Sequence, residues 1–244
     1  MGINEISQFF RQFSGKLGAN IYAGFNGPTS PQQLAFLRAL QKEVRQNSSL
    51  DTPLNKLKAV VFDLETTGFH PEKGDQVISI GAIKMLGYRI DEEETFYSLL
   101  KSDCPLPIEI SSLTNIRNED LQRAPNALNV LLQFFKYIKS DLLVAHHSKH
   151  EQAFMQKLTR DLLRTKFEHR IVDTSFLIRI ADPSIKSWTL EEVCEKNGIE
   201  IKNRHHALGD AIMTAHVWSC YLQKAEAKGF KNLREVYEYL ARNE

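Results

Sequence analysis

Asp63 and Glu65 stand two positions apart, directly after the apolar run 59–62. Such a run, partly β-branched, is typical of a strand buried on both faces, and side chains at i and i+2 point to the same side of a sheet. Two neighbouring carboxylates at the end of a buried strand repel each other and resist loss of water unless a cation lies between them. The motif fits a metal site, and it fits equally well a pair of solvated acids beside the turn at 66–68.

A second acid, Glu151, follows the short apolar run 142–145 and stands where a helix is expected to begin. Phe154, Leu158 and Leu162 share its helical face, so this carboxylate lies on an otherwise apolar stripe. A helix start favours a negative charge because the N-terminal end of the helix dipole is positive. Glu151 is therefore either a member of a polar site or a residue that stabilises the helix terminus.

Three histidines, His146, His147 and His150, precede this acid. His146 and His150 are four positions apart, which is a spacing that can bind zinc when both residues lie on one helix. The helix is expected to begin at Lys149, after His146, and no cysteine lies nearby. Zinc is the less favoured alternative here.

Asp210 and His205 form the third candidate group. Asp210 shares a helical face with apolar residues such as Met213 and Val217, and His205 lies five residues earlier, in the loop before that helix. Each residue alone has an ordinary explanation, since an acid in a first helical turn favours the helix dipole and loop histidines are common.

Taken together, these residues predict metal-dependent phosphoryl chemistry. Asp63, Glu65, Glu151 and Asp210 all lie at strand ends or helix starts, and such ends converge on one crevice in α/β sheets. Four carboxylates without sulfur select hard divalent cations such as Mg²⁺ or Mn²⁺, and a pair of these about 4 Å apart supports in-line displacement at phosphorus. His205, with an ordinary pKa near 6.5, could take the proton from an attacking water.

The elements that must position these residues are predicted from periodicity and capping signals. Three strands come first, followed by alternating helices and strands, which implies an α/β fold with a mixed central sheet flanked by helices. The expected strands are 58–64, 76–86, 93–101, 142–145 and 169–173, and the expected helices are 126–138, 149–163, 189–197, 206–228 and 231–242.

The N-terminal part, residues 1–56, reads differently and is expected to be a helical extension. Ile6, Phe9, Phe10 and Phe13 have the spacing of an apolar helical face, and Ser30–Gln33 forms a capping box that opens a helix to about residue 46. Residues 47–53 are rich in turn formers and are expected to be a linker.

Composition is that of an ordinary soluble globular protein, with 42% hydrophobic and 25% charged residues. No apolar stretch approaches the roughly 20 residues that cross a bilayer, and no signal-peptide pattern is visible. A net charge of only +1 excludes a protein that coats nucleic acid by bulk electrostatics. The three cysteines are widely spaced and odd in number, so reduced thiols and a cytoplasmic location are expected.

The chain resembles the DnaQ-like, DEDDh class of 3′–5′ exonucleases, typified by the proofreading ε subunit of bacterial DNA polymerase III. The resemblance covers about residues 57–225 and implies an RNase H-like fold and removal of nucleoside 5′-monophosphates from a 3′ end. It rests on five segments, Asp63-x-Glu65-Thr66-Thr67-Gly68, Gly74–Ala82, Leu113–Ile116, Val144–Met155 and His205-x4-Asp210-Ala211.

Residue roles follow from this resemblance. Asp63, Glu65 and Asp210 match metal ligands of the family, Glu151 matches the fourth acid, and His205 matches the general base. Contacts with the terminal nucleotide are implied for Thr66, Thr67, Gly68, Phe69, Thr114 and His146.

The second motif departs from the family pattern at three positions. His147, His150 and Glu151 stand where the family has asparagine, an aromatic residue and aspartate. Glu151 is one methylene longer than aspartate, and Mg²⁺ demands near-ideal octahedral geometry. We expect a weakened metal site or ligation through water, with Mn²⁺ better tolerated.

The predicted organisation is an extension over 1–56, an exonuclease domain over 57–228 and a C-terminal helix over 229–244. The expected substrate is single-stranded nucleic acid, DNA more than RNA. The alternative is a weakly active or non-catalytic module that binds a polymerase or nucleic-acid partner. Residues 33–37 loosely resemble peptides that bind sliding clamps, although helix capping and burial explain the same residues.

Overall fold

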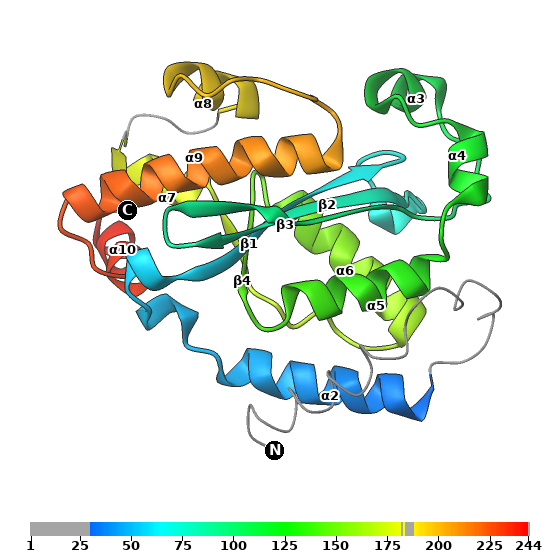
Figure 1. Cartoon of the computed structure of the whole chain (residues 1–244), viewed down its shortest axis with the longest axis horizontal. Helices are drawn as coiled ribbons and strands as arrows, with labels where there is room; N and C mark the ends of the chain where they lie inside the picture. The colour runs from blue at the N-terminus through cyan, green and yellow to red at the C-terminus, as the bar shows by residue number, and fades with distance from the viewer. Residues whose placement is uncertain (1–29, 182, 184–187, 244) are drawn as a thin grey trace. The chain divides into compact units, whose positions relative to one another are not determined.

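A mixed five-stranded sheet forms the centre of the protein, as the sequence predicts (Figure 1). The computed structural model describes residues 30–181, 183 and 188–243. The strand order is β3-β2-β1-β4-β5, with the first three antiparallel and the last two parallel to β1. The strands are β1 (Lys58–Thr66), β2 (Val77–Leu86), β3 (Arg89–Leu99), β4 (Leu142–Ala145) and β5 (Ile171–Asp173).

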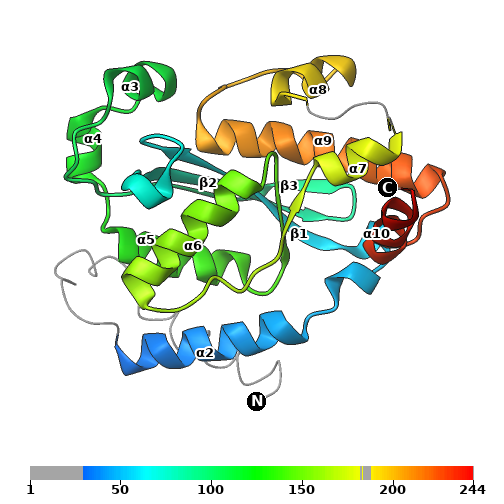
Figure 2. The same ribbon diagram turned by 180° about the vertical axis from the view of Figure 1, so that it is seen from behind.

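Helices cover both faces of this sheet, which explains why β1 reads as a nearly continuous apolar run. Helix α9 lies across one face, and α5 with α6 lie on the other (Figures 1 and 2). The helices within residues 37–244 are α3 (Ile108–Thr114), α4 (Asn118–Arg123), α5 (Ala127–Ile138), α6 (Lys149–Leu163), α7 (Ser175–Ala181), α8 (Leu190–Lys196), α9 (Ala207–Ala227) and α10 (Leu233–Arg242).

Alternation along β1 decides which side chains meet which helix. Phe62 points to the α5 face, where its ring centroid lies 5.7 Å from that of Phe134. Val61 points the other way, into the large core cluster that contains Trp218 of α9. Since Asp63 has the same parity as Val61, its side chain projects to the α9 face.

The observed elements differ from the predicted ones in the ends of several strands and in three short helices. Strand β1 continues to Thr66, where it pairs with Val77 of β2. Strand β3 begins at Arg89 because a tight turn at Gly87, with φ +57°, lets β2 and β3 pair immediately. The short helices α3, α4 and α7 were not predicted. One- or two-turn helices carry too few residues to show a helical period.

The segment expected to be a linker, residues 47–53, is ordered against the C-terminal helix. It contains the single turn η1 (Ser49–Asp51) and is followed by η2 (Leu54–Lys56). Leu54 is buried, its backbone N–H donates to the Lys231 carbonyl at 2.9 Å, and Asp51 pairs with Arg234. Residues 37–56 accordingly belong to the same compact unit as the sheet, and the domain boundaries at 56/57 and 228/229 stay predictions.

Helix α2 (Pro31–Gln46) begins at the predicted capping box. The Ser30 N–H donates to Gln33 Oε1 at 2.7 Å, and the Gln33 N–H donates to Ser30 Oγ at 3.2 Å. The expected apolar helical face at 6–13 lies outside the described residues. No helix among those described is both long and apolar enough to span a membrane, and Cys104, Cys194 and Cys220 are free thiols.

Candidate metal centre

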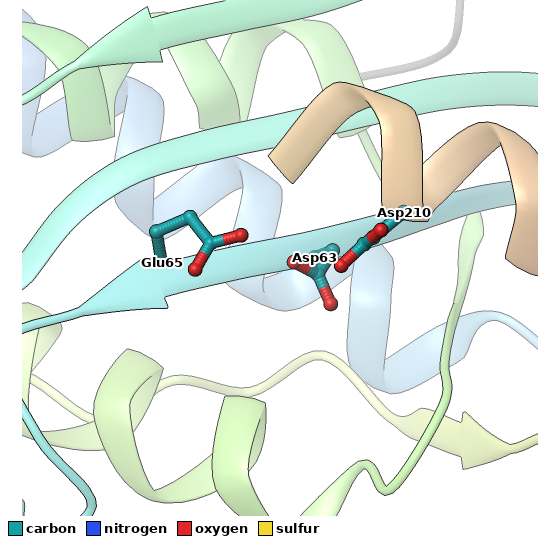
Figure 3. A group of neighbouring side chains, drawn as sticks. All are labelled: Asp63, Glu65 and Asp210. Atoms are coloured by element: carbon teal, nitrogen blue, oxygen red, sulfur yellow. The ribbon is translucent and has the colours of Figure 1, made fainter. Parts of the chain in front are cut away.

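Three of the four predicted acids converge at one point of the sheet. Ligand oxygens of Asp63, Glu65 and Asp210 all lie within 4.8 Å of one another, two from β1 and one from the first turn of α9 (Figure 3). Asp63 and Glu65 share the α9 face because they are two residues apart on a strand. The predicted convergence of the first and third motifs is confirmed by this geometry.

The close approach of α9 to the sheet depends on Gly81 of β2, which pairs with Asp63. A Cβ atom on Gly81 would lie 2.1 Å from the backbone nitrogen of Leu208. The first turn of α9 therefore rests directly on the strand backbone, and this places Asp210 beside Asp63.

Burial and mutual repulsion make these acids reluctant to ionise. Burial raises the pKa of Asp63 well above its usual value, and the charges of Glu151, Asp210 and Glu65 raise it further. Burial, followed by the charge of Asp210, raises the pKa of Glu65 to about 7. Burial also raises the pKa of Asp210 to about 6, although Arg204 opposes this shift. Such a group gains free energy when it binds a cation.

Glu151 lies next to this group but outside the set of oxygens within 4.8 Å. Its side chain is buried in the first turn of α6, and its Oε2 has no hydrogen-bond partner. Burial raises the pKa of Glu151 to about 8, with the charges of Asp173 and Glu65 adding to the shift. Its influence on the pKa of Asp63 shows that the two carboxylates interact.

Asp173, at the end of β5, fixes the helix that carries Glu151, and sequence reasoning did not single it out. Its Oδ2 accepts the Ser148 N–H at 2.6 Å, and its Oδ1 accepts the Ser175 N–H at 2.9 Å. Burial would raise the pKa of Asp173, but the hydrogen bonds from Ser175 and Ser148 lower it overall. Asp173 therefore caps the starts of two helices, α6 and α7. In the sequence, only its position as an acid between a strand and a helix could have indicated this role.

His205 lies in the loop before α9, with its backbone in the left-handed region at φ +61°. Its side chain is partly exposed, and burial together with the neighbouring Arg204 lowers its pKa. The lowered pKa favours the neutral ring, whose Nδ1 lies 3.2 Å from Arg204 Nη1. The next residue, His206, caps α9 by accepting the Gly209 N–H at 3.4 Å and stacks on Tyr97 with 4.3 Å between centroids.

Arg204 is a second residue that sequence reasoning missed. Its guanidinium pairs with Glu191 of α8 at 2.6 Å and with Asp210 of the acid group. Its position directly before His205 was the available signal, but an arginine in a loop is usually solvated.

The loop that follows β1 presents Phe69 to solvent, with 77% of its surface exposed. The Thr66 hydroxyl donates to the Gly68 carbonyl at 2.7 Å, and the Thr67 hydroxyl donates to Asp75 at 3.3 Å. A Cβ atom on Gly68 would lie 2.4 Å from Asp75 Oδ2, so a larger residue here would displace the Asp75 side chain. The predicted nucleotide-contacting loop is thus held in place by Asp75.

Thr114 and His146, both expected to contact the nucleotide, have their polar atoms bonded inside the protein. The Thr114 hydroxyl is buried and donates to the Ile110 carbonyl at 2.9 Å. His146 Nδ1 lies 2.6 Å from the Thr174 hydroxyl, and Nε2 lies 3.0 Å from the Trp188 carbonyl. Both ring nitrogens of His146 are therefore bonded within the protein, and its contact with a nucleotide stays a prediction.

The zinc alternative at His146 and His150 gains no support from the described residues. In that part of the chain, one group of three or more His, Cys, Asp or Glu side chains lies close enough together to bind a metal ion. This group contains no histidine. His150 instead takes an aromatic role, with its ring centroid 4.7 Å from Phe154 and 5.8 Å from Phe69.

The acid group fits a hard divalent cation. Asp210 Oδ1 and Glu151 Oε2 are buried without hydrogen-bond partners, which is costly unless another group satisfies them. The ligand set consists of carboxylate oxygens, the donors that hard cations prefer.

Comparison with known proteins agrees with this site. A family model described as "Exonuclease" matches residues 60–218, which is more than half of the chain. A DNA polymerase III subunit epsilon-like protein of Rhodobacter capsulatus is 30% identical over 194 residues, covering 78% of this chain and 27% of that protein. The 3′–5′ exonuclease DinG of Staphylococcus saprophyticus is 31% identical, covering 75% of this chain and 20% of that protein. The chain thus spans about a quarter or less of these relatives' length.

The fold is shared with solved nucleases. The nuclease domain of 3′hExo, a DEDDh family member bound to rAMP, superposes with a TM-score of 0.61 at 18% identity and covers 69% of this chain and 93% of that domain. This likeness confirms the RNase H-like sheet with flanking helices. The residues that the family model matches include Asp63, Glu65 and Asp210, and the chain belongs to the exonuclease family.

Proposed function

We propose that this protein is a 3′–5′ exonuclease that hydrolyses the terminal phosphodiester bond of single-stranded nucleic acid and releases nucleoside 5′-monophosphates. The observation that carries the proposal is the convergence of Asp63, Glu65 and Asp210 within 4.8 Å, in a chain of the exonuclease family. His205, in the loop that leads into α9, supports a hydrolytic role for the same site.

The acid group would hold two divalent cations, Mg²⁺ or Mn²⁺, through Asp63, Glu65, Asp210 and Glu151. When bound, such cations lower the pKa of a bound water and stabilise charge on the phosphate oxygens. The partnerless oxygens of Asp210 and Glu151 support this assignment.

The protein's own residues would do the remaining work. His205 takes the proton of the attacking water at a ring nitrogen, since its lowered pKa favours the neutral ring. Phe69 offers an exposed aromatic face against which a terminal base can stack. The loop that carries Phe69 is held by two hydrogen bonds, from the Thr66 hydroxyl to the Gly68 carbonyl and from the Thr67 hydroxyl to Asp75.

DNA is the substrate that we favour over RNA. The Rhodobacter relative is named for DNA polymerase III, which supports a role on DNA in replication or repair in the cytoplasm. The 3′hExo domain is bound to a ribonucleotide, so RNA is the alternative that an assay must include. A polymerase or sliding-clamp contact through residues 1–56 is a lesser proposal, because Gln33 is occupied in the capping box of α2.

A weakly active or non-catalytic module is the second candidate, and one observation favours it. Glu151 lies outside the group of mutually close oxygens and is one methylene longer than the family aspartate. The retained His205 supports the active enzyme, because a pure binding module needs no proton acceptor beside its acids.

The decisive experiment is digestion of 5′-labelled single-stranded DNA and RNA by the purified protein with Mg²⁺, Mn²⁺ or EDTA. We expect metal-dependent shortening from the 3′ end, and its loss in Asp63→Ala and Asp210→Ala with the circular dichroism spectrum unchanged. Undiminished digestion by either variant would overturn the assignment. Inactivity of the wild-type protein with both metals would favour the binding module.

A further inference from the structure

Arg204 links the acid group to a helix that carries none of the metal-binding candidates. Its Nε donates to Glu191 Oε1 at 2.6 Å, and its Nη1 donates to Asp210 Oδ2. Glu191 lies in the first turn of α8, and Asp210 lies in the first turn of α9. One partly buried guanidinium therefore joins two helix starts through two carboxylates.

This contact fixes the orientation of the Asp210 carboxylate. Its side chain is only 5% exposed, so solvent does not compete for its oxygens. Arg204 occupies Oδ2, whereas Oδ1 is buried with no hydrogen-bond partner. One carboxylate oxygen of Asp210 lies within 4.8 Å of ligand oxygens of Asp63 and Glu65. Of the two oxygens of Asp210, Oδ1 is the one without a hydrogen-bond partner. Fixing one oxygen of a carboxylate fixes the direction of the other.

The charge of Arg204 is balanced by its second partner. An arginine side chain does not lose its proton in proteins, so its positive charge is permanent. Glu191 neutralises this charge, and the pair adds no net charge beside the acids. A guanidinium fork can hold two acceptors in a fixed plane, which a lysine ammonium cannot do. Arg204 lowers the pKa of Asp63, Glu65 and Asp210 by its charge, and its fork adds a geometric contribution that a lysine would not make.

We propose that Arg204 is a positioning residue for metal binding, which holds Asp210 Oδ2 so that Oδ1 is presented to a divalent cation, while Glu191 anchors the guanidinium. This inference rests on the proposed function, because it requires that Asp210 binds a metal. The opposite possibility is that Arg204 competes with the cation for Asp210, and the two roles predict changes of opposite sign in metal affinity.

The test is isothermal titration of the full-length protein with Mn²⁺ alone, with no nucleic acid present. We expect Arg204→Gln to weaken Mn²⁺ binding about 10- to 100-fold, as is usual when the hydrogen-bond partner of a metal ligand is lost. Arg204→Lys keeps the positive charge but loses the fork of N–H donors. We expect this variant to bind Mn²⁺ at least about 10-fold more weakly than the wild-type protein. Lys202→Gln is the matched control. It removes a positive charge two residues before Arg204, from an exposed ion pair between Lys202 and Glu200.

A double-mutant cycle tests the anchoring role of Glu191. If Glu191 acts through Arg204, the double variant Glu191→Gln/Arg204→Gln binds Mn²⁺ as weakly as Arg204→Gln alone. Circular dichroism and the melting temperature in EDTA establish that each variant is folded, and the Arg204→Lys variant keeps the test available if Arg204→Gln does not fold.

Several outcomes would overturn the proposal. Unchanged or tighter Mn²⁺ binding by Arg204→Gln contradicts positioning, and tighter binding shows competition. Wild-type affinity in Arg204→Lys shows that charge alone matters. Failure of the wild-type protein to bind Mn²⁺ overturns the proposed metal site itself, whereas wild-type binding with an unaffected Arg204→Gln variant overturns only the role of Arg204.

Discussion

Gly81 of β2 lies so close to the first turn of α9 that a Cβ atom on it would stand 2.1 Å from the backbone nitrogen of Leu208. The same added atom would lie 2.2 Å from the Ala207 carbonyl carbon. Both neighbours are backbone atoms of the helix that carries Asp210, and such atoms cannot rotate away. The distance between the strand acids and the helix acid is thus set by the absence of a side chain at one position.

Gly81→Ala is therefore expected to separate Asp210 from Asp63. A forced backbone shift of this kind costs about 1–3 kcal/mol of stability, and a displacement near 1 Å can lower a catalytic rate about 100-fold. The measurement is the rate of single-strand digestion at saturating Mn²⁺, beside the free energy of unfolding in urea.

Gly198→Ala is the matched control for this prediction. Gly198 has φ +66° with no neighbouring atom within 4 Å, so alanine there strains the backbone but meets nothing. It should lose about 1–2 kcal/mol of stability and keep its activity. Equal activity of the Gly81 and Gly198 variants would contradict the role of the close contact.

The raised pKa values of the acids predict how the stability of the EDTA-treated protein depends on pH. In the fold the pKa of Glu65 is about 7 and that of Glu151 is about 8, against about 4.3 for an unfolded glutamate. The unfolded state therefore binds fewer protons than the folded state as pH rises from about 4 to 8, so the free energy of unfolding falls.

Thermal unfolding between pH 7 and pH 8.5 isolates this effect, because that window lies above the ordinary pKa of histidine, near 6.5. We expect a loss of about 1–2 kcal/mol, or a fall of about 2–8 °C in melting temperature. Glu151→Gln should flatten the profile, and added Mg²⁺ should raise the melting temperature more at pH 8.5 than at pH 7. A melting temperature that rises with pH in EDTA would refute the argument.

Shortening Glu151 tests the departure from the family pattern. Glu151→Asp should keep or raise the Mg²⁺-supported rate and increase the ratio of Mg²⁺- to Mn²⁺-supported rates, because Mg²⁺ tolerates ligand misplacement poorly. The buried site loses one methylene, so a stability cost of about 1 kcal/mol is expected. A clear loss of rate with both metals, in a variant that is folded, would show that the longer side chain is required.

The parts of the fold that follow from local pattern were predictable. The apolar run before Asp63 placed β1, and the Ser30–Gln33 capping box placed the start of α2. The shared parity of Asp63 and Glu65 predicted that both carboxylates lie on one face.

The remainder depends on contacts that join distant parts of the chain. His146 is occupied by the Trp188 carbonyl, 42 residues away, and no local pattern reveals that bond. Leu54 lies in a polar, turn-rich stretch, yet it is buried because the C-terminal segment at Lys231 pairs with it. Gly81 reads as an ordinary glycine in a strand until the helix above it is known.

Asp173 gives the last prediction, because it holds the start of the helix that bears Glu151. Its two oxygens accept the backbone N–H groups of Ser148 and Ser175. Asp173→Asn keeps one acceptor and replaces the other with a donor, which leaves one buried N–H unsatisfied at a cost of about 1–3 kcal/mol. We expect lower stability and Mn²⁺ binding weakened about 10-fold, since the support of a metal-binding residue is loosened. Asp161→Asn, which breaks only surface pairs with Lys157 and Arg160 on the same helix, should change neither quantity. Equal Mn²⁺ affinity of the two variants would show that Glu151 is positioned without Asp173.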